Sequence, residues 1–227
     1  MRGRPADWQS QLAGDPPAVL AAAAAAAGFD GIYINRVGYA DSTAFGLEAT
    51  LTRLLRTRPI VSKDGRLSFF DARLYAKRLM ATIRPPRLTA LRNATLYPVR
   101  LDAGAGAQTP PSRDFPISGV GIHGAVRIRQ RGELEARNPS AEERAVIFEA
   151  QLSIAGTARP TTLRFPGARP LRLVVGRRPV PVCRLLHIRR DAAIRFKLAR
   201  PATLHIDGAR LTDLAYEPVI RTRPCRD

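Results

Sequence analysis

One short run of the chain holds the polar residues whose types and spacing could carry out chemistry. The run Gly28–Tyr39 has the sequence GFDGIYINRVGY, in which an aspartate precedes an apolar core and an asparagine and an arginine follow it. Side chains at strand ends in α/β folds often act as acids, bases or nucleophiles. An amide exchanges no proton at neutral pH, so Asn35 cannot replace a catalytic carboxylate. We assign no catalytic residue, and the candidate polar site comprises Asp30, Asn35, Arg36 and Asp41.

The charge of the chain is its most unusual property. Its 37 basic and 19 acidic residues give a net charge of +18 at pH 7, and nearly all of the basic residues are arginine. Arginine binds phosphate and carboxylate groups through planar pairs of hydrogen bonds, so anionic partners are candidates. Arg127, Arg129 and Arg131 alternate along a predicted strand. We expect them to share one face as an anion-binding group.

Two kinds of polyanion would suit such an arginine group. The phosphates of nucleic acid are one, and the headgroups of anionic lipids are the other. Aromatic residues make up only 6% of the chain, and no recognised nucleic-acid-binding motif occurs. Nucleic acid is therefore the less favoured of the two. The remaining arginines are scattered, which is typical of a solvated surface.

The cysteines and histidines do not indicate a metal site. Cys183 and Cys225 are the only cysteines, and neither has a partner at the spacing of metal ligands. They could form one disulfide in an oxidising compartment. His123, His187 and His205 are far apart in the sequence, and we interpret them as structural. We expect no metal, and no nucleotide-binding motif indicates a cofactor.

Residues 1–83 predict helices and strands in alternation. Ala18–Ala27 has maximal helix propensity, and Gly28 is positioned to end that helix in the left-handed conformation. Phe29–Asn35 is typical of a buried strand. A second helix, a hairpin at Asp64-Gly65 and a third helix follow. We interpret residues 1–83 as a partial α/β domain built from βα units.

The rest of the chain changes character. Residues 84–114 are rich in proline and glycine and are predicted to be a linker with one strand at Ala94–Leu101. Residues 115–220 alternate polar and apolar positions in about eight short segments, with a last strand near Leu214–Tyr216, which predicts an antiparallel β-sandwich. Residues 221–227 form a tail. The predicted fold class is therefore α+β.

Three runs resemble one family of bacterial proteins. They are Gly28–Asp41, Pro59–Asp71 and Gly132–Ser140. Together they are similar to the C-terminal extracytoplasmic region of large polytopic membrane proteins described as sugar translocases or phosphoglycerol-transferase-like proteins, which resemble membrane glycosyltransferases. The resemblance covers nearly the whole chain. It departs at Asn35, where the family usually has aspartate, and this departure weakens any role for an ionised group there.

The resemblance implies a role for the chain. It would be the non-catalytic soluble accessory region of a membrane protein that transfers glycan or glycerophosphate at the cell surface, and it would bind carbohydrate. Its partners would be glycan, anionic lipid headgroups and the membrane-embedded region of full-length relatives, which would be transferase-like. The membrane part is absent, so we expect Met1 to be an internal start. In the relatives this region would face the periplasm at the inner membrane.

Two alternatives stay open, and so does the location of the chain. The first is a glycoside-hydrolase-like remnant that uses Asp30 or Asp41. The second is an arginine-rich binder of nucleic acid or anionic lipid. No signal peptide is visible, and the apolar run Ala18–Ala27 is too short to span a bilayer, which needs about 20 residues. If the chain is expressed alone, we therefore expect it in the cytoplasm.

Overall fold

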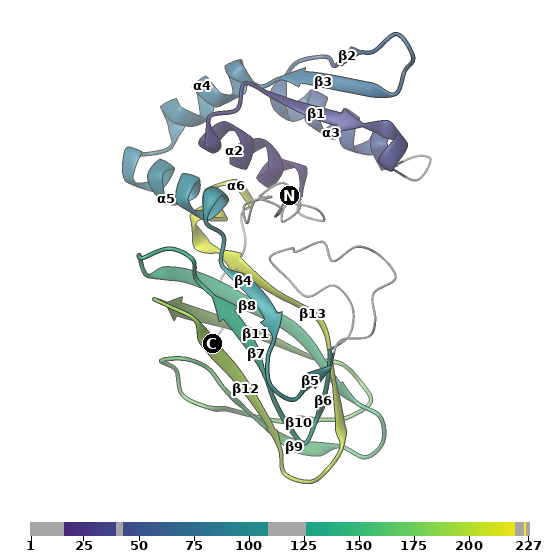
Figure 1. The fold of residues 1–227 in the computed structure, drawn as a ribbon, viewed down its shortest axis with the longest axis vertical. Coiled ribbons are helices and arrows are strands. Elements are labelled where there is room, and N and C mark those ends of the chain that lie inside the picture. Colours follow the sequence, from purple (N-terminus) through teal and green to yellow (C-terminus); the bar gives the residue numbers. More distant parts are fainter. Residues whose placement is uncertain (1–15, 40–42, 109–125, 221–224, 226–227) are drawn as a thin grey trace, which may run out of the picture. The chain divides into compact units, whose positions relative to one another are not determined.

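The computed structural model describes residues 16–39, 43–108, 126–220 and 225 (Figure 1). These residues form two compact units. The helical unit comprises residues 16–96 and 215–220, and the two-sheet unit comprises residues 97–214 and 225. The chain builds the helical unit first, then the two-sheet unit, and contributes its C-terminal helix to the helical unit. Helices and antiparallel sheets both occur, so the α+β class is confirmed.

Helix α2 (Pro17–Ala27) supplies an alanine surface on which the helical unit is built. Pro17 lies in the first turn, where its missing amide hydrogen costs nothing. Gly28 ends the helix in the predicted left-handed conformation, with φ of 87°. The side chains of residues 21–26 are all buried. Because alanine side chains are short, neighbouring elements can approach this helix closely.

A small antiparallel sheet follows α2. Strand β1 (Gly31–Asn35) pairs with β3 (Leu67–Asp71), which also pairs with β2 (Ile60–Val61). The β2–β3 hairpin turns where the sequence predicts, and Gly65 has a φ of 70° there. Every pairing in the described part of this sheet is antiparallel. The prediction of βα units, which implies parallel strand pairing, is therefore wrong for this sheet.

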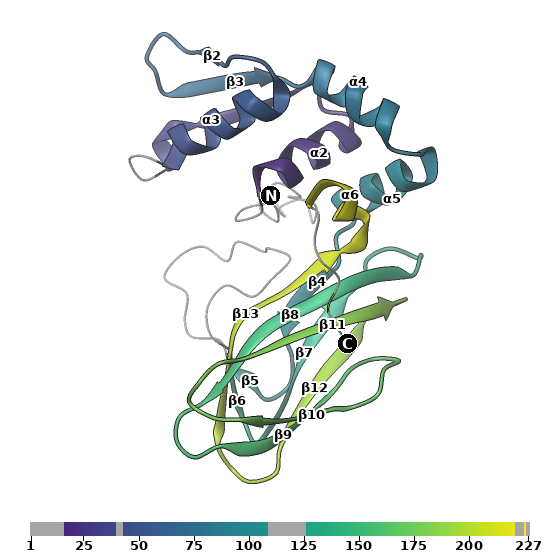
Figure 2. The ribbon, with the colours of Figure 1, turned by 180° about the vertical axis from the view of Figure 1, so that it is seen from behind.

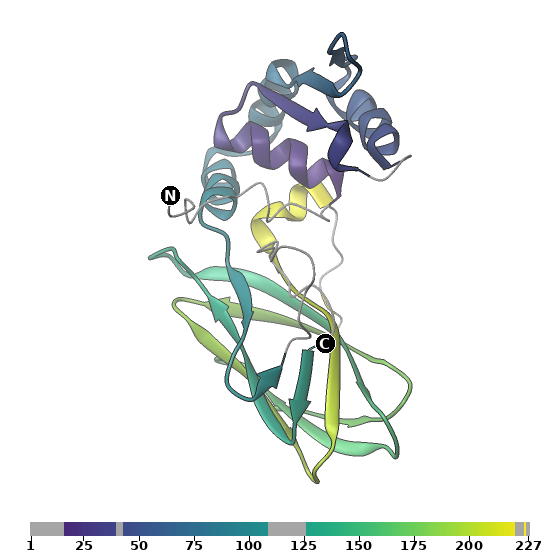
Figure 3. The same ribbon diagram turned by 45° about the vertical axis from the view of Figure 1, so that its right-hand side comes forward.

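Four further helices complete the helical unit. They are α3 (Thr43–Leu55), α4 (Arg73–Thr82), α5 (Pro85–Leu96) and α6 (Glu217–Ile220), with the short 3-10 turns η1 (Arg36–Gly38) and η2 (Leu214–Tyr216). Helix α2 contacts all four of these helices and β1 (Figure 3). The buried hydroxyls of Thr95 and Tyr216 lie 3.0 Å apart and link α5 to the returning chain. In the described ranges, no helix combines the length and apolarity needed to cross a bilayer.

The linker predicted over residues 84–114 was wrong in its first half. Pro85 and Pro86 begin α5, because proline is tolerated in the first turn of a helix. The strand predicted at Ala94–Leu101 lies partly in that helix. The strand forms slightly later, as β4 (Arg100–Ala103), and belongs to the two-sheet unit.

The two-sheet unit contains ten strands among its described residues. After β4 they are β5 (Ala107–Gln108), β6 (Val126–Arg129), β7 (Arg131–Arg137), β8 (Arg144–Ile154), β9 (Arg159–Arg164), β10 (Leu171–Val175), β11 (Val180–Ile188), β12 (Ala192–Leu198) and β13 (Thr203–Asp213). The β7 sheet has the order β10-β9-β12-β7-β4, and the β8 sheet has the order β11-β8-β13-β6-β5 (Figures 1 and 2). All pairings are antiparallel, so the predicted antiparallel β region is confirmed. The last predicted strand, near residues 214–216, is η2 instead.

Both sheets contribute to one hydrophobic core. Phe196 and Leu134 from the β7 sheet and Phe148 and Leu152 from the β8 sheet belong to the same buried cluster. Alternate residues of each strand enter this core, as the period of two requires. The intervening residues therefore form two outer faces, and these faces hold most of the arginines considered below.

One disulfide and one buried ion pair link separate segments of the two-sheet unit. Cys183 and Cys225 form a disulfide, with their Cα atoms 5.4 Å apart. Arg144 at the start of β8 donates two hydrogen bonds to Oδ2 of Asp213 at the end of β13, at 3.0 and 2.7 Å. Both side chains of this ion pair are almost completely buried. The pair therefore joins the ends of β8 and β13, and each buried charge is compensated by the other.

Candidate functional site

Arg36, from the predicted polar site, is held in a network with Glu48 and Ser68. Its Nε and Nη2 atoms each lie 2.8 Å from a carboxylate oxygen of Glu48, and Nη1 donates to the carbonyl oxygen of Gly65. The Ser68 hydroxyl donates to Oε1 of Glu48 at 2.6 Å. The paired hydrogen bonds raise the pKa of Arg36 and lower the pKa of Glu48. Arg36 therefore fastens η1 to α3 and β3.

The other three residues of the predicted polar site do not join Arg36. Oδ1 of Asn35 accepts a hydrogen bond from the amide of Val37 at 3.1 Å, which caps η1. Asp30 is exposed, and its carbonyl oxygen accepts a hydrogen bond from the amide of Ala72. Asp41 lies outside the described residues. The described residues of this group thus stabilise local structure and form no common site.

Several carboxyl groups of the helical unit have a lowered pKa. Hydrogen bonds from Arg73 lower the pKa of Asp71 to about 2. Hydrogen bonding also lowers the pKa of Glu48 and of Asp64. A general acid needs the opposite shift, toward neutrality. Within the described ranges, no three His, Cys, Asp or Glu side chains gather as a metal site would require.

The predicted arginine group does not share one face. Arg127 and Arg129 are exposed on β6, which belongs to the β8 sheet. Gln130 then adopts a left-handed conformation with φ of 51°, and the chain turns there. Arg131 begins β7, which belongs to the β7 sheet. The prediction failed because strict alternation assumes one continuous strand, and the chain changes sheet at Gln130.

Arg131 instead joins a different group of cations on the outer face of the β7 sheet. Arg131 pairs across strands with Lys197, Lys197 pairs with Thr162, and Thr162 pairs with Arg172. Residues paired on neighbouring antiparallel strands point to the same face, so these four form one row across four strands. At a strand spacing of about 4.8 Å, the row is about 14 Å long.

A second row runs beside the first. In it, Glu133 pairs with Arg195 and Arg195 pairs with Arg164. We call the two rows without Glu133 the basic face, and its members are Arg131, Thr162, Arg164, Arg172, Arg195 and Lys197. All of its cationic side chains are exposed.

Charge on the basic face is poorly compensated. Glu133 lies 3.3 Å from Nε of Arg195 and is its ion-pair partner. Within the described part of the chain, the other four cations make no ion pair; they are Arg131, Arg164, Arg172 and Lys197. Like charges on neighbouring strands repel each other, so this arrangement is unfavourable unless solvent or an anion compensates it. The two-sheet unit therefore presents an exposed cationic surface.

The outer face of the β8 sheet is polar but has mixed charge. Strand pairing places Gln108, Arg127, His205 and Ser153 in one row across four strands. Beside His205 and Ser153 lies a depression with a volume of about 730 Å³, which Arg177 and Asp207 also line. Asp207 offsets the positive charge of Arg177, so this depression is less cationic than the basic face.

The helical unit exposes an apolar row. Tyr33 pairs with Phe69 across β1 and β3, and Phe69 pairs with Ile60 across β3 and β2. Tyr33 is 62% exposed and Ile60 is 69% exposed. The ring centroids of Tyr33 and Phe69 lie 6.5 Å apart. The predicted strand Phe29–Asn35 is therefore buried on one side only.

Comparisons with known proteins identify no family. No protein-family model matches the chain, and no curated protein matches it. Among solved structures, the Cry4Aa toxin from Bacillus thuringiensis aligns with a TM-score of 0.33 and 8% identity, over 50% of this chain and 23% of the toxin. A GH26-CBM35 β-(1,4)-mannanase from Podospora anserina aligns with a TM-score of 0.33 and 10% identity, over 56% of this chain and 29% of the enzyme.

A third solved structure is a single domain. It is a CBM35 domain from Cellvibrio japonicus, and it aligns with a TM-score of 0.30 and 9% identity, over 51% of this chain and 91% of that domain. The chain spans less than a third of the toxin and of the mannanase. TM-scores this low carry no argument about function.

Proposed function

We propose that this chain is a non-catalytic, β-sandwich-type binding region that holds an anionic glycan or a glycerophosphate-bearing polymer through the basic face. The observation that carries the proposal is the set of four cations without ion-pair partners among the described residues, Arg131, Arg164, Arg172 and Lys197. They lie on neighbouring strands and are exposed. A bound polyanion would neutralise these four charges and remove their mutual repulsion. An uncompensated cationic surface is therefore what a polyanion-binding role requires.

The chemistry of the basic face suits phosphate and carboxylate groups. Arginine presents a rigid fork of donors to such groups, and charge-assisted hydrogen bonds are about twice as strong as neutral ones. Thr162 lies between Lys197 and Arg172 in the row, where its hydroxyl can bond to a sugar or phosphate oxygen. A row of about 14 Å would contact several repeating units of a polymer rather than one small molecule.

The sequence resemblance described above extends this proposal to a cellular setting. In that setting the chain is the soluble accessory region of a membrane protein that transfers glycan or glycerophosphate. It lies at the periplasmic face of the inner membrane, and the membrane-embedded region is its partner. The polymer or the anionic headgroups held by the basic face would be the acceptor or the product of that transfer.

Binding of defined polymers tests the proposal. The full chain is titrated with poly(glycerol phosphate), with a neutral dextran of similar length, with double-stranded DNA and with vesicles containing phosphatidylglycerol. We expect poly(glycerol phosphate) to bind more tightly than dextran, with affinity that falls steeply as salt rises. Tighter binding to DNA or to vesicles would instead favour the arginine-rich nucleic-acid or lipid binder.

A pair of matched variants assigns the binding to the basic face. Arg131→Gln combined with Lys197→Gln removes two adjacent charges from that face. We expect this variant to bind at least about tenfold more weakly and its salt slope to shrink by about two. Arg127→Gln combined with Arg129→Gln removes the same charge from the other sheet. Equal losses in the two variants would mean that net charge alone attracts the polymer, and the proposal would fail.

An enzymatic role is the alternative that the site supports less. Asp71, Glu48 and Asp64 have lowered pKa values, which argues against each as a general acid. A sugar-cleavage assay on common glycans tests this directly. Cleavage that is lost in Asp30→Asn or Asp41→Asn would establish a glycosidase-like activity and overturn the non-catalytic role.

A further inference from the structure

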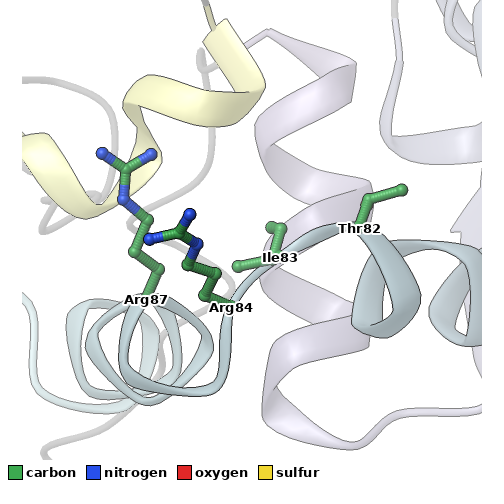
Figure 4. Close-up of a pocket in the computed structure, with 4 residues that line it drawn as sticks. All are labelled: Thr82, Ile83, Arg84 and Arg87. Atoms are coloured by element: carbon green, nitrogen blue, oxygen red, sulfur yellow. The ribbon is translucent and has the colours of Figure 1, made fainter.

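A pocket opens in the helical unit where α4 passes into α5. It has a volume of about 430 Å³ and is lined by Thr82, Ile83, Arg84 and Arg87. Figure 4 shows the side chains of Arg84 and Arg87 extending toward the same side of α5, and both line the pocket. The pocket belongs to the helical unit and shares no residue with the basic face.

The two arginines of this pocket have no protein partner in the described part of the chain. Neither forms a side-chain hydrogen bond or an ion pair there. Arg84 directly precedes α5 and Arg87 is its third residue, and the first turn of this helix contains no acidic residue. Cations are disfavoured at the positive end of a helix, and each of the two also repels the other. The pair is therefore electrostatically unfavourable as it stands.

Among the described residues that line the pocket, the two arginines are the main donors. Pro85 and Pro86 have no amide hydrogen, and the amides of Arg87 and Leu88 already donate to the carbonyl oxygen of Arg84. The hydroxyl of Thr82 donates to backbone carbonyl oxygens of the preceding turn of α4. From these described residues, an entering ligand would meet two guanidinium forks and the apolar side chain of Ile83.

We propose that this pocket binds a phosphate group carried by a small organic moiety. Two adjacent guanidinium groups can each donate paired hydrogen bonds to phosphate oxygens, and a dianion would cancel both charges. The volume lies in the range of pockets that hold small ligands, so there is room for more than inorganic phosphate. Ile83 would contact the carbon skeleton beside the phosphate. The phosphate could belong to a soluble phosphomonoester or to a lipid headgroup.

Titration of the full chain with three probes tests this site. They are inorganic phosphate, glycerol 3-phosphate, and vesicles containing phosphatidic acid compared with vesicles of phosphatidylcholine, each followed by calorimetry or by NMR shifts of the arginine side chains. We expect glycerol 3-phosphate to bind more tightly than inorganic phosphate and to shift the signals of Arg84 and Arg87. Vesicle binding that shifts the signals of Arg84 and Arg87, without binding of the soluble ester, would assign the site to a lipid headgroup. Failure of all three probes to shift these arginines would overturn the proposal.

Matched variants separate a specific site from general attraction by charge. Arg84→Gln and Arg87→Gln are each expected to weaken binding at least about tenfold, since each removes charge-assisted hydrogen bonds. Arg92→Gln removes one charge from an exposed position on the same helix and should leave binding unchanged. Arg84→Lys combined with Arg87→Lys keeps the charge but loses the paired geometry, so intermediate binding is expected. Equal affinity in Arg84→Gln, Arg92→Gln and the unmodified chain would contradict the assignment.

Discussion

The ring of Phe69 lies directly over Gly31 on the outer face of the small sheet. A Cβ atom at residue 31 would overlap Cε2 and Cζ of that ring and would also approach the carbonyl oxygen of Phe70. Gly31→Ala should therefore force the ring or the strand pairing to shift, and we expect the free energy of unfolding to fall by about 1–3 kcal/mol. Chemical denaturation followed by far-ultraviolet circular dichroism measures the change.

Gly46 supplies the control for this substitution. It lies within α3, and a Cβ atom there would meet nothing within 4 Å. Because alanine favours the helix over glycine by about 1 kcal/mol, Gly46→Ala should stabilise the helical unit. A loss of stability in both variants would show that crowding against Phe69 is not the cause of the first effect.

Glu48 is the buried centre of the network that holds Arg36 and Ser68. Its carboxylate accepts two hydrogen bonds from Arg36 and one from Ser68. Glu48→Ala leaves both donors without their partner, so we expect the free energy of unfolding to fall by about 3 kcal/mol. Glu149→Ala breaks the exposed pair with Arg210 and should cost less than about 1 kcal/mol. Similar losses in the two variants would contradict the structural role of Glu48.

This network also predicts how stability depends on pH. Arg36 lowers the pKa of Glu48 in the folded chain below its value in the unfolded chain. The unfolded state therefore takes up a proton first as pH falls, and the contribution of Glu48 to stability is lost below about pH 4.5. Unfolding curves between pH 7 and pH 3 should show a steeper loss for the native chain than for Glu48→Gln. Parallel pH profiles would indicate that folding leaves the pKa of Glu48 unchanged.

Local signals in the sequence were enough to predict several elements of the fold. Gly28 follows an alanine run and ends its helix, and the hairpin at Asp64-Gly65 forms where these two residues stand together. The antiparallel pairing of β1 with β3 could not be read from the sequence, because it depends on contacts between distant segments. Pro85 and Pro86 were misinterpreted as a linker, because proline favours both loops and the first turn of a helix.

The candidate site was harder to predict than the fold, because it depends on pairing between strands that are distant in the sequence. Alternation predicted that Arg129 and Arg131 share a face, but the left-handed turn at Gln130 separates them. The neighbour of Arg131 is Lys197, which is far away in the sequence. The alternation of Arg195 and Lys197 in the segment of β12 was the available signal. Their register against β7 decides whether they meet, and no local pattern determines that register.

Asp71 and Arg73 form an exposed ion pair whose effect on titration can be measured directly. Hydrogen bonds from Arg73 lower the pKa of Asp71 to about 2. Carboxyl carbon shifts followed by NMR should give a midpoint near this value for Asp71. In Arg73→Gln the midpoint should rise toward about 3.9, the ordinary value for aspartate. A midpoint that stays near 2 in the variant would assign the shift to another group.

The disulfide between Cys183 and Cys225 closes a loop in the two-sheet unit. The two residues are 42 positions apart, and a loop of that length restricts the unfolded chain by about 4 kcal/mol in the chain-entropy account. Cys183→Ser combined with Cys225→Ser should lower the free energy of unfolding by about 2–4 kcal/mol. Thermal unfolding with and without a reductant measures the loss.

The same experiment contains its own control. Reductant should destabilise the native chain by about as much as the double substitution does, and it should have no effect on the double variant. A native chain that is insensitive to reductant would mean that the bond contributes nothing in solution. Strong sensitivity would mean that the two-sheet unit is substantially more stable in an oxidising compartment, where such bonds persist. That outcome would favour the extracytoplasmic setting proposed above over a reducing one.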